Sequence, residues 1–398
     1  MVVKMRTVFM NADIVTPDRV LENCCMAVEK NVITEVGYDI DIKNSRVIDV
    51  KGRYILPGII DIHSDMIENL LQPRSTALMD YSMGLEEAEK QLAACGITTI
   101  YHSVSMYRSG SWDSREIRSA KSVEKLSRLI KEKAGKPRLI NIRYHLRYEL
   151  DNVECYDKVL ELIDNRYVDL LSIMDHRPGQ GQYRDLSIYC RHLPQEGKNL
   201  SDEEFEALVK KEQTKPMLEG GRLERLIKTA RKNGVSVSSH DDDTVDCIER
   251  NVSLGVSVSE FPITLEVAEE ASERGLFTLL GAPNVLLGGS HSGNLSAREA
   301  IEHGCGDILC SDYYPQSLLR AVFYLVKNSV LSMPDACRLV SYNPARAVGI
   351  SKQTGAIEKG KDADFLIAET DGDFSPRLLQ VWVSGKRVLK HKYFNEER

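Results

Sequence analysis

The chain has 398 residues, more than one typical hydrophobic core holds, so we expect two domains or a barrel with an appendage. Its net charge of -7 argues against a general nucleic-acid-binding or acidic-membrane surface, because such surfaces need excess Lys and Arg. Nine cysteines without a C-x-x-C pair favour reduced thiols in the cytoplasm. No apolar run approaches about 18 residues, so we expect no signal peptide or membrane span. The sequence does not decide between a monomer and a homo-oligomer.

Both ends of the chain are predicted to form short β-strands. β-branched and aliphatic residues, separated by turn residues such as Asn11, Asp13 and Gly37, dominate residues 7–16, 24–37, 45–58, 363–370 and 378–390. We expect these ends to pair into one small β-sandwich. The expected divisions are residues 1–56, a central domain of residues 57–345, and residues 346–398.

Between the ends, strand-like runs alternate with helical stretches, as a parallel sheet requires. The predicted strands are residues 58–65, 97–104, 138–150, 168–176, 235–242, 256–262, 277–284 and 307–314. The predicted helices include residues 84–96, 204–213, 221–234, 264–275, 295–304 and 315–330. The predicted fold class is therefore α/β, a (β/α)8 barrel of the TIM type. The polar residues 179–216 are expected to form an inserted loop or lid.

Acids and histidines stand at or just beyond the ends of several predicted strands. A (β/α)8 barrel gathers the carboxyl ends of its strands on one face, so residues far apart in the sequence can meet around one ion. Imidazole nitrogens and carboxylate oxygens are good ligands for zinc and similar divalent ions. The candidate ligands are His63, Asp65, Glu149, His176, His240 and Asp312.

Each candidate also has a purely structural explanation. A strand-end histidine can be hydrogen-bonded without a metal, and Arg143, Arg147 and Glu149 could form a surface ion-pair ladder. Asp175 could orient His176 as a hydrogen-bond acceptor. At least one aspartate of residues 241–243 is expected to cap the next helix, and Asp312 or Ser311 could cap another. The set as a whole is more specific than any member.

Several motifs carry a resemblance to a known family. The first predicted strand and two C-terminal motifs resemble the amidohydrolase superfamily over essentially the whole chain; they read PGIIDIHSD, NPARAVGI and GAIEKGKDADFLI. Five longer motifs resemble the diphosphatase family of the carbon–phosphorus lyase pathway for phosphonates: SIMDHRPGQGQY, SSHDDDT, EFPITLEVAEEA, GAPNVLLGGSHSGN and ILCSDYYPQSLL. The resemblance implies hydrolysis of alpha-D-ribose 1-methylphosphonate 5-triphosphate to the 5-phosphate and diphosphate.

The resemblance also implies one or two divalent metal ions, with zinc expected first and manganese or iron as alternatives. The superfamily's usual first-strand pair of histidines is replaced here by His63 and Asp65. No lysine occupies the strand-end position of Glu149, which leaves Glu149 to replace a carboxylated-lysine bridge. In the implied mechanism the ions acidify a water, and Asp312 is the catalytic residue that directs it at a phosphorus.

Phosphate-binding cations are expected near these ligands despite the acidic total. Guanidinium groups suit phosphate oxygens, and the loop after a barrel's seventh strand often binds phosphate through its backbone amides. The substrate-binding candidates are Arg74, Arg143, Arg147, Arg177, His145, Ser290, His291, Ser292 and Asn294. Taken singly, each arginine is more often part of a surface ion pair.

Two other functions fit the same pattern. The same barrel and metal site serve hydrolysis of cyclic amides and deamination of amino-substituted rings, and a fold does not decide its substrate. Comparing phosphate release with turnover of a cyclic-amide panel separates these reactions. A metal-free barrel scaffold is the rival from a different class, and metal analysis tests it.

Overall fold

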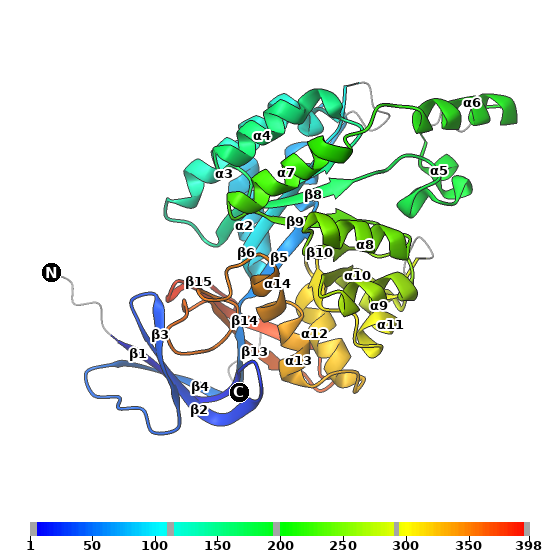
Figure 1. Ribbon diagram of the computed structural model, residues 1–398. Helices are drawn as coiled ribbons and strands as arrows, with labels where there is room; N and C mark the ends of the chain where they lie inside the picture. Colours follow the sequence, from blue (N-terminus) through cyan, green and yellow to red (C-terminus); the bar gives the residue numbers. More distant parts are fainter. Residues whose placement is uncertain (1–5, 110–114, 194–199, 290–293, 394–398) are drawn as a thin grey trace.

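The computed structural model describes residues 6–109, 115–193, 200–289 and 294–393. Two β-sheets organise these residues, one in the centre of the chain and one built from its two ends (Figure 1). Within the described ranges, no helix is long and apolar enough to cross a membrane.

The central sheet consists of eight parallel strands, and all eight predicted strands are confirmed. They are β5 (Ile59–Ser64), β6 (Ile97–Met106), β7 (Asn141–Glu149), β8 (Leu170–Met174), β9 (Ser236–His240), β10 (Val258–Glu260), β11 (Phe277–Gly281) and β12 (Ile308–Cys310). At the carboxyl ends of the first and last strands, the Asp312 amide donates to the His63 carbonyl (3.1 Å) and the Asp65 amide donates to the Asp312 carbonyl (2.8 Å). These bonds close the sheet into a barrel.

Helices surround the barrel, on its outside and at its amino end. They are α1 (Met66–Leu71), α2 (Tyr81–Ala94), η1 (Glu116–Arg118), α3 (Ala120–Ala134), η2 (Val153–Cys155), α4 (Tyr156–Asp164), α7 (Gly220–Lys232), α8 (Val245–Leu254), α9 (Leu265–Glu273), α10 (Ala282–Leu287), α11 (Ala297–Glu302), α12 (Ser317–Lys327), α13 (Met333–Arg338) and α14 (Tyr342–Ala347). In α3, the buried residues Val123, Leu126 and Ile130 recur at spacings of three and four, which turns one apolar stripe toward the strands.

The amino end of the barrel is filled by apolar side chains. Ala345 and Ala347 of α14 pack with Ile60, Leu170 and Val258 in one buried cluster. This plug leaves the carboxyl end of the strands as the face on which polar groups can gather.

Residues 179–216, expected as an inserted loop or lid, contain η3 (Gly181–Tyr183), α5 (Leu186–His192) and α6 (Asp202–Gln213). In Figure 1, α5 and α6 project from the barrel on its upper right side. Tyr183 and Tyr189 form a small core of their own there, against which Phe205 packs. Arg108 ties α6 to the barrel through Glu212 (3.3 Å) and through Asp151 after β7 (2.7 Å). The insertion is therefore a packed helical unit, and its role as a lid stays a prediction.

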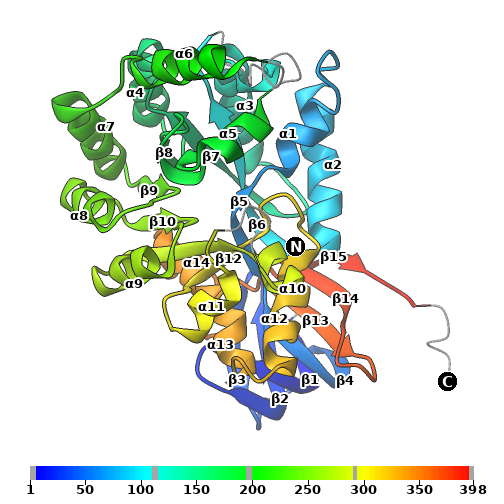
Figure 2. The ribbon, with the colours of Figure 1, turned by 90° about the vertical axis from the view of Figure 1, so that its right-hand side faces the viewer.

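The two chain ends pair with each other, as expected, and together they form one seven-stranded mixed sheet. Its order is β15-β14-β13-β4-β1-β2-β3, with β1 (Thr7–Val15), β2 (Val20–Glu29), β3 (Val32–Gly37), β4 (Arg46–Pro57), β13 (Phe365–Thr370), β14 (Pro376–Val383) and β15 (Lys386–Lys390). Antiparallel pairing of β13 with β4 joins the two ends, and Phe9, Phe365 and Trp382 pack in the sheet's own core. Figures 1 and 2 both place this sheet on the far side of the barrel from α6.

Candidate metal centre and substrate pocket

Three buried side chains meet inside the barrel. Nδ1 of His63 (β5) lies 3.1 Å from Oε2 of Glu260 (β10), and Nε2 of His145 (β7) lies 3.6 Å from Oε1 of Glu260. All three side chains are 1% exposed or less, and Ser103 lies 3.0 Å from Nδ1 of His145. A buried carboxylate needs such partners because an isolated charge is costly away from water.

A second group lies at the ends of β8 and β9. Nε2 of His176 lies 3.3 Å from Oδ2 of Asp241, and Nδ1 of His240 lies 2.9 Å from the same oxygen. All three atoms are buried, and none has a hydrogen bond of acceptable geometry within the described chain. They lie within 4.8 Å of one another. Because buried polar atoms are normally satisfied, this arrangement fits a divalent ion bound by two imidazoles and a carboxylate.

A third group combines His63 with Asp65 and Asp312. Nε2 of His63 lies 3.8 Å from Oδ1 of Asp65, and one ligand atom from each residue falls within 4.8 Å of the others. Since a metal-bound histidine usually donates its other N–H to a carboxylate, Glu260 at Nδ1 is well placed to orient His63. The described residues therefore offer ligands for either one ion or two.

Glu149, expected as a bridging ligand, belongs to none of these groups. Its carboxylate contacts Nδ1 of His176, on the opposite side of the ring from Asp241. Burial alone would lower the pKa of His176, but Glu149 and Asp241 raise it to about 10. In this position Glu149 fixes the direction of the His176 ring, because it engages the nitrogen that faces away from the candidate site.

Arg147 lies between the second and third groups. Its Nη1 donates to Oδ1 of Asp65 (2.8 Å), and its Nη2 lies 3.3 Å from Nε2 of His240. The two ring nitrogens of His240 therefore face different residues: Nε2 faces Arg147 and Nδ1 faces Asp241. A fixed guanidinium is thus built into the centre of the candidate site.

The three aspartates after His240 have different surroundings, and none of them caps α8. The side chain of Thr244 caps this helix by accepting from the Cys247 amide (3.2 Å). Asp241 faces the second group, whereas Asp242 accepts hydrogen bonds inside the protein and Asp243 accepts from the amide of Gly181 in the insertion (2.9 Å). Likewise, Gln316 stands at the cap position of α12, so Asp312 and Ser311 do not cap that helix.

A pocket of about 300 Å³ opens onto the second and third groups. The ring of Phe261 lies 5.0 Å from that of His63 and 5.3 Å from that of His240, and forms one wall. The other polar lining residues include Asp65, Ser105, Tyr107, Arg118, Arg147, His176, Gln182, Tyr183, Asn284, Asn294 and Asp312. Metal ligands, guanidinium groups and hydrogen-bonding side chains therefore share one pocket.

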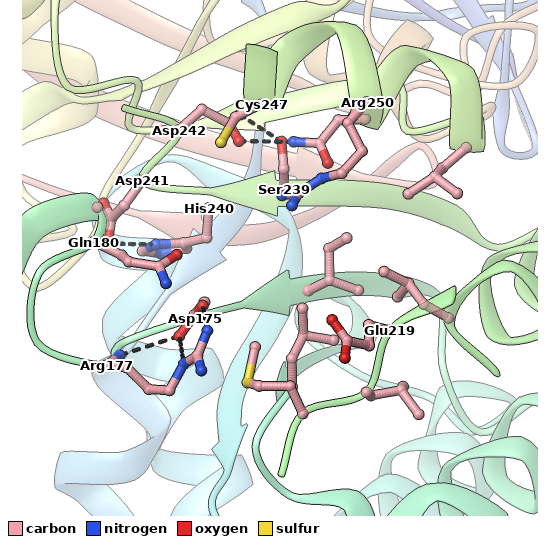
Figure 3. Close-up of a pocket in the computed structure, with 18 of the residues that line it drawn as sticks. Asp175, Arg177, Gln180, Glu219, Ser239, His240, Asp241, Asp242, Cys247 and Arg250 are labelled. Carbon is pink, nitrogen blue, oxygen red and sulfur yellow. Dashed lines mark hydrogen bonds and ion pairs between the residues drawn. The ribbon is translucent and has the colours of Figure 1, made fainter. Parts of the chain in front are cut away.

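A larger cavity of about 670 Å³ also borders His240 and Asp241 and is lined by residues at and beyond the carboxyl ends of β8 and β9 (Figure 3). Arg177, expected to bind substrate, lies here and donates to Asp175 through Nε (2.8 Å) and Nη2 (2.7 Å). Its charge is therefore already paired, and Figure 3 shows the pair across from the His240–Asp241 contact.

The remaining substrate-binding candidates fall in different places. Arg74 is exposed in the turn after α1, and Arg143 pairs with Asp169 (3.3 Å) near the amino end of β7, so the structure brings neither to the pocket. His145 lies inside the barrel beside Glu260, whereas Arg147 and Asn294 line the pocket. Ser290, His291 and Ser292 lie outside the described residues.

Sequence reasoning missed three residues of this region, namely Glu260, Asp241 as a possible ligand, and Arg118. Glu260 was detectable, because it is the last residue of the predicted strand VSVSEFP to face the barrel and follows the same strand-end rule as His240. Arg118 is the last residue of η1, well beyond the end of β6, and no strand-end signal marks it.

Comparison with known proteins agrees with this architecture. The model of the amidohydrolase family matches residues 186–388. An alpha-D-ribose 1-methylphosphonate 5-triphosphate diphosphatase from Escherichia coli (strain K12) is 34% identical over 354 residues, covering 86% of this chain and 89% of that protein. An adenine deaminase from Lactobacillus delbrueckii subsp. bulgaricus is 23% identical over 358 residues, covering 86% of this chain and 52% of that protein.

Solved structures share the fold. A D-hydantoinase has a TM-score of 0.66 at 15% identity, with coverage of 97% of this chain and 95% of that chain. An N-acetylglucosamine-6-phosphate deacetylase from Pasteurella multocida has a TM-score of 0.64 at 13% identity, with coverage of 96% and 99%. On the family match and the long relative together, the chain belongs to the amidohydrolase family, whose members are metal-dependent hydrolases.

Proposed function

We propose that this protein hydrolyses alpha-D-ribose 1-methylphosphonate 5-triphosphate to the 5-phosphate and diphosphate, the reaction named for its relative from Escherichia coli. The observation that carries the proposal is the presence of two guanidinium groups, Arg118 and Arg147, in the pocket that holds the candidate metal ligands. A triphosphate needs such fixed cations, because its phosphoryl oxygens are highly charged. We place the reaction in the cytoplasm, in keeping with nine cysteines that are all free.

Two groups of residues are proposed to hold divalent ions, with zinc expected first and manganese or iron as alternatives. His176, His240 and Asp241 would hold one ion, and His63, Asp65 and Asp312 a second. When bound, such an ion lowers the pKa of a water toward about 7 and offsets charge on phosphoryl oxygens.

The protein's own side chains have distinct roles in this proposal. Asp312 accepts a proton from the attacking water and returns it to the leaving group, which is general base and acid catalysis. Arg147, held by Asp65, donates hydrogen bonds to the oxygens of the reacting phosphoryl group. Glu149 keeps His176 directed at the site.

Deamination of an amino-substituted ring is the second candidate, because the adenine deaminase relative also spans 86% of the chain. The pocket favours the phosphorylated substrate. Two guanidinium groups in one pocket complement the charge of phosphoryl oxygens, whereas a neutral ring carries no charge for them to complement.

Phosphorus NMR of the metal-loaded protein with the ribose triphosphate tests the proposal directly. We expect resonances of diphosphate and of the 5-phosphate, and none of these products with Asp312→Asn under the same conditions. Parallel reactions with ATP and with adenine measure diphosphate and ammonia release. Ammonia from adenine without diphosphate from the ribose triphosphate would overturn the proposal in favour of a deaminase.

A further inference from the structure

We infer that Gln182, Asn284 and Phe261 form a site for the ribose ring of the substrate, in which the two amide side chains determine specificity for its hydroxyl groups. The inference rests on the proposed function and deepens it, because it assigns one part of the pocket to the sugar and not to the phosphates. All three residues line the pocket that holds the candidate metal ligands, and none of them belongs to the three candidate groups.

The proposed substrate needs two kinds of hydrogen-bonding partner. Phosphoryl oxygens only accept hydrogen bonds, so N–H donors suit them. A sugar hydroxyl both donates and accepts, and a side-chain amide matches it with an N–H donor and a carbonyl acceptor. Among the residues that the structure describes, the half-buried side chains of Gln182 and Asn284 have no hydrogen bond to the rest of the chain. Both amides are therefore available to a ligand in the pocket.

The backbone around Gln182 is fixed by hydrogen bonds. Gln182 lies in η3, at the start of the insertion that follows β8. The Gly181 amide donates to Oδ2 of Asp243 (2.9 Å), and the Gly179 amide donates to the Tyr183 carbonyl (2.9 Å). These bonds hold the segment against the loop after β9, so little backbone entropy is lost when Gln182 binds a ligand. The insertion thus supplies one wall of the pocket.

Asn284 reaches the pocket from a different part of the barrel. It lies in the first turn of α10, which directly follows β11, and the strands β9 and β10 separate β11 from β8. The carbonyl of Asn284 accepts from the amides of Gly288 (3.1 Å) and Gly289 (3.2 Å), so the helix fixes its backbone. Two separate walls of one pocket therefore each carry an amide, which suits a small ring with several hydroxyl groups.

Phe261 adds an apolar surface to the same part of the pocket. It directly follows β10, and β10 lies between β8 and β11 in the order of the barrel strands. The C–H groups of a sugar ring pack on an aromatic face, while a few placed polar groups fix the orientation of the ring. The Phe261 ring also lies 5.0 Å from that of His63 and 5.3 Å from that of His240. A ribose packed against Phe261 therefore keeps its 5-phosphate chain close to the candidate metal ligands.

Binding of ribose 5-phosphate, its 2-deoxy and 3-deoxy analogues and inorganic phosphate to the metal-loaded protein tests the inference without turnover. Isothermal titration compares the parent protein with Gln182→Ala, Asn284→Ala and the control Gln180→Ala. Gln180 is the matched control because it is a glutamine of the same segment that borders the larger cavity and not this pocket. We expect the parent to bind each deoxy analogue about 3- to 10-fold more weakly than ribose 5-phosphate. Gln182→Ala and Asn284→Ala should each lose this preference for one hydroxyl, with unchanged affinity for inorganic phosphate, and Gln180→Ala should keep both preferences.

The outcomes separate this inference from the proposed function. The inference is overturned if the parent binds ribose 5-phosphate no better than its deoxy analogues or inorganic phosphate, or if the alanine variants keep both preferences. An equal loss in Gln180→Ala also overturns it, because that loss would trace to the segment and not to the pocket amide. If an alanine variant does not fold, parental preferences in Gln182→Glu or Asn284→Asp overturn it instead. If the preferences depend on both amides but the parent releases no diphosphate from the ribose triphosphate, the sugar site stands and the proposed reaction falls.

Discussion

Replacing Glu149 tests whether this residue orients a metal ligand or is one. In the structure its carboxylate contacts Nδ1 of His176, and Nε2 of the same ring points to Asp241 at 3.3 Å. Glu149→Ala removes the acceptor that fixes the ring, while every ligand atom of the His176 group remains. Loss of such an orienting partner typically lowers metal affinity by about 10- to 100-fold, equivalent to about 1.4 to 2.7 kcal/mol. Glu149→Gln keeps a hydrogen-bond acceptor and should lose less.

Competition with a chromophoric zinc chelator measures the affinity, and elemental analysis measures the number of ions per chain. Glu154→Ala is the control, because Glu154 is a nearby but exposed glutamate on η2 and should leave both quantities unchanged. We expect Glu149→Ala to bind the parental number of ions at saturating metal, but more weakly, whereas His176→Ala should lose one ion. If Glu149→Ala also loses a full ion at saturation, Glu149 is a ligand and the orienting role is refuted.

Three further predictions address catalysis, packing and pH. Asp312→Asn should keep its fold and lose turnover by about 10²- to 10⁴-fold; a near-parental rate with metal bound would exclude its role in proton transfer. Asp242→Ala should lower the free energy of unfolding by at least about 3 kcal/mol in urea titrations, because Ser239, Ser259 and Asn251 lose a buried acceptor. Burial lowers the pKa of His102 to about 3, so below about pH 6.5 the unfolded chain gains a proton that the folded chain does not, and stability falls as pH falls toward 3. In His102→Leu, the fall in the free energy of unfolding between pH 7 and pH 5 should be about 2 kcal/mol smaller than in the parent. An equal fall in both proteins would contradict this.

The strands of the barrel were predictable because a parallel sheet is buried on both faces. Such a strand is often a short apolar run bounded by turns, and β8 stands out in the sequence for this reason, whereas β7 alternates apolar and polar residues. The pairing of the chain ends was predictable from the return of the same pattern after the last helix. The packed helices of the insertion were not, because their stability depends on a local cluster around Tyr183 and Tyr189 that only the folded chain assembles.

The sequence of β7 predicts which side chains share a face of the strand, but the distance of each residue along the strand also decides whether it reaches the pocket. Arg143, His145, Arg147 and Glu149 alternate on β7 and share one face. At about 3.3 Å per residue, Arg143 and Arg147 are separated by about 13 Å along the strand. That distance takes Arg143 to Asp169 near the amino end and leaves Arg147 among the candidate ligands at the carboxyl end. An arginine close in sequence to a candidate ligand is therefore a poor predictor of substrate binding, and its position along the strand is a better one.

Three residues just beyond the strand ends have left-handed backbone conformations that the sequence does not predict. Asp241 and Phe261 directly follow β9 and β10, and Asp312 lies two residues beyond β12; their φ angles are +55°, +56° and +55°. Such left-handed conformations cost about 1 to 3 kcal/mol for residues other than glycine. They are rarer for a bulky residue such as phenylalanine than for aspartate. Barrel hydrogen bonds hold them, since the Asp241 amide donates to the Glu260 carbonyl (2.8 Å) and the Phe261 amide to the Leu279 carbonyl (2.9 Å). Because each turn aims its side chain into the pocket, glycine at these positions would relieve the backbone and remove the group that the site requires.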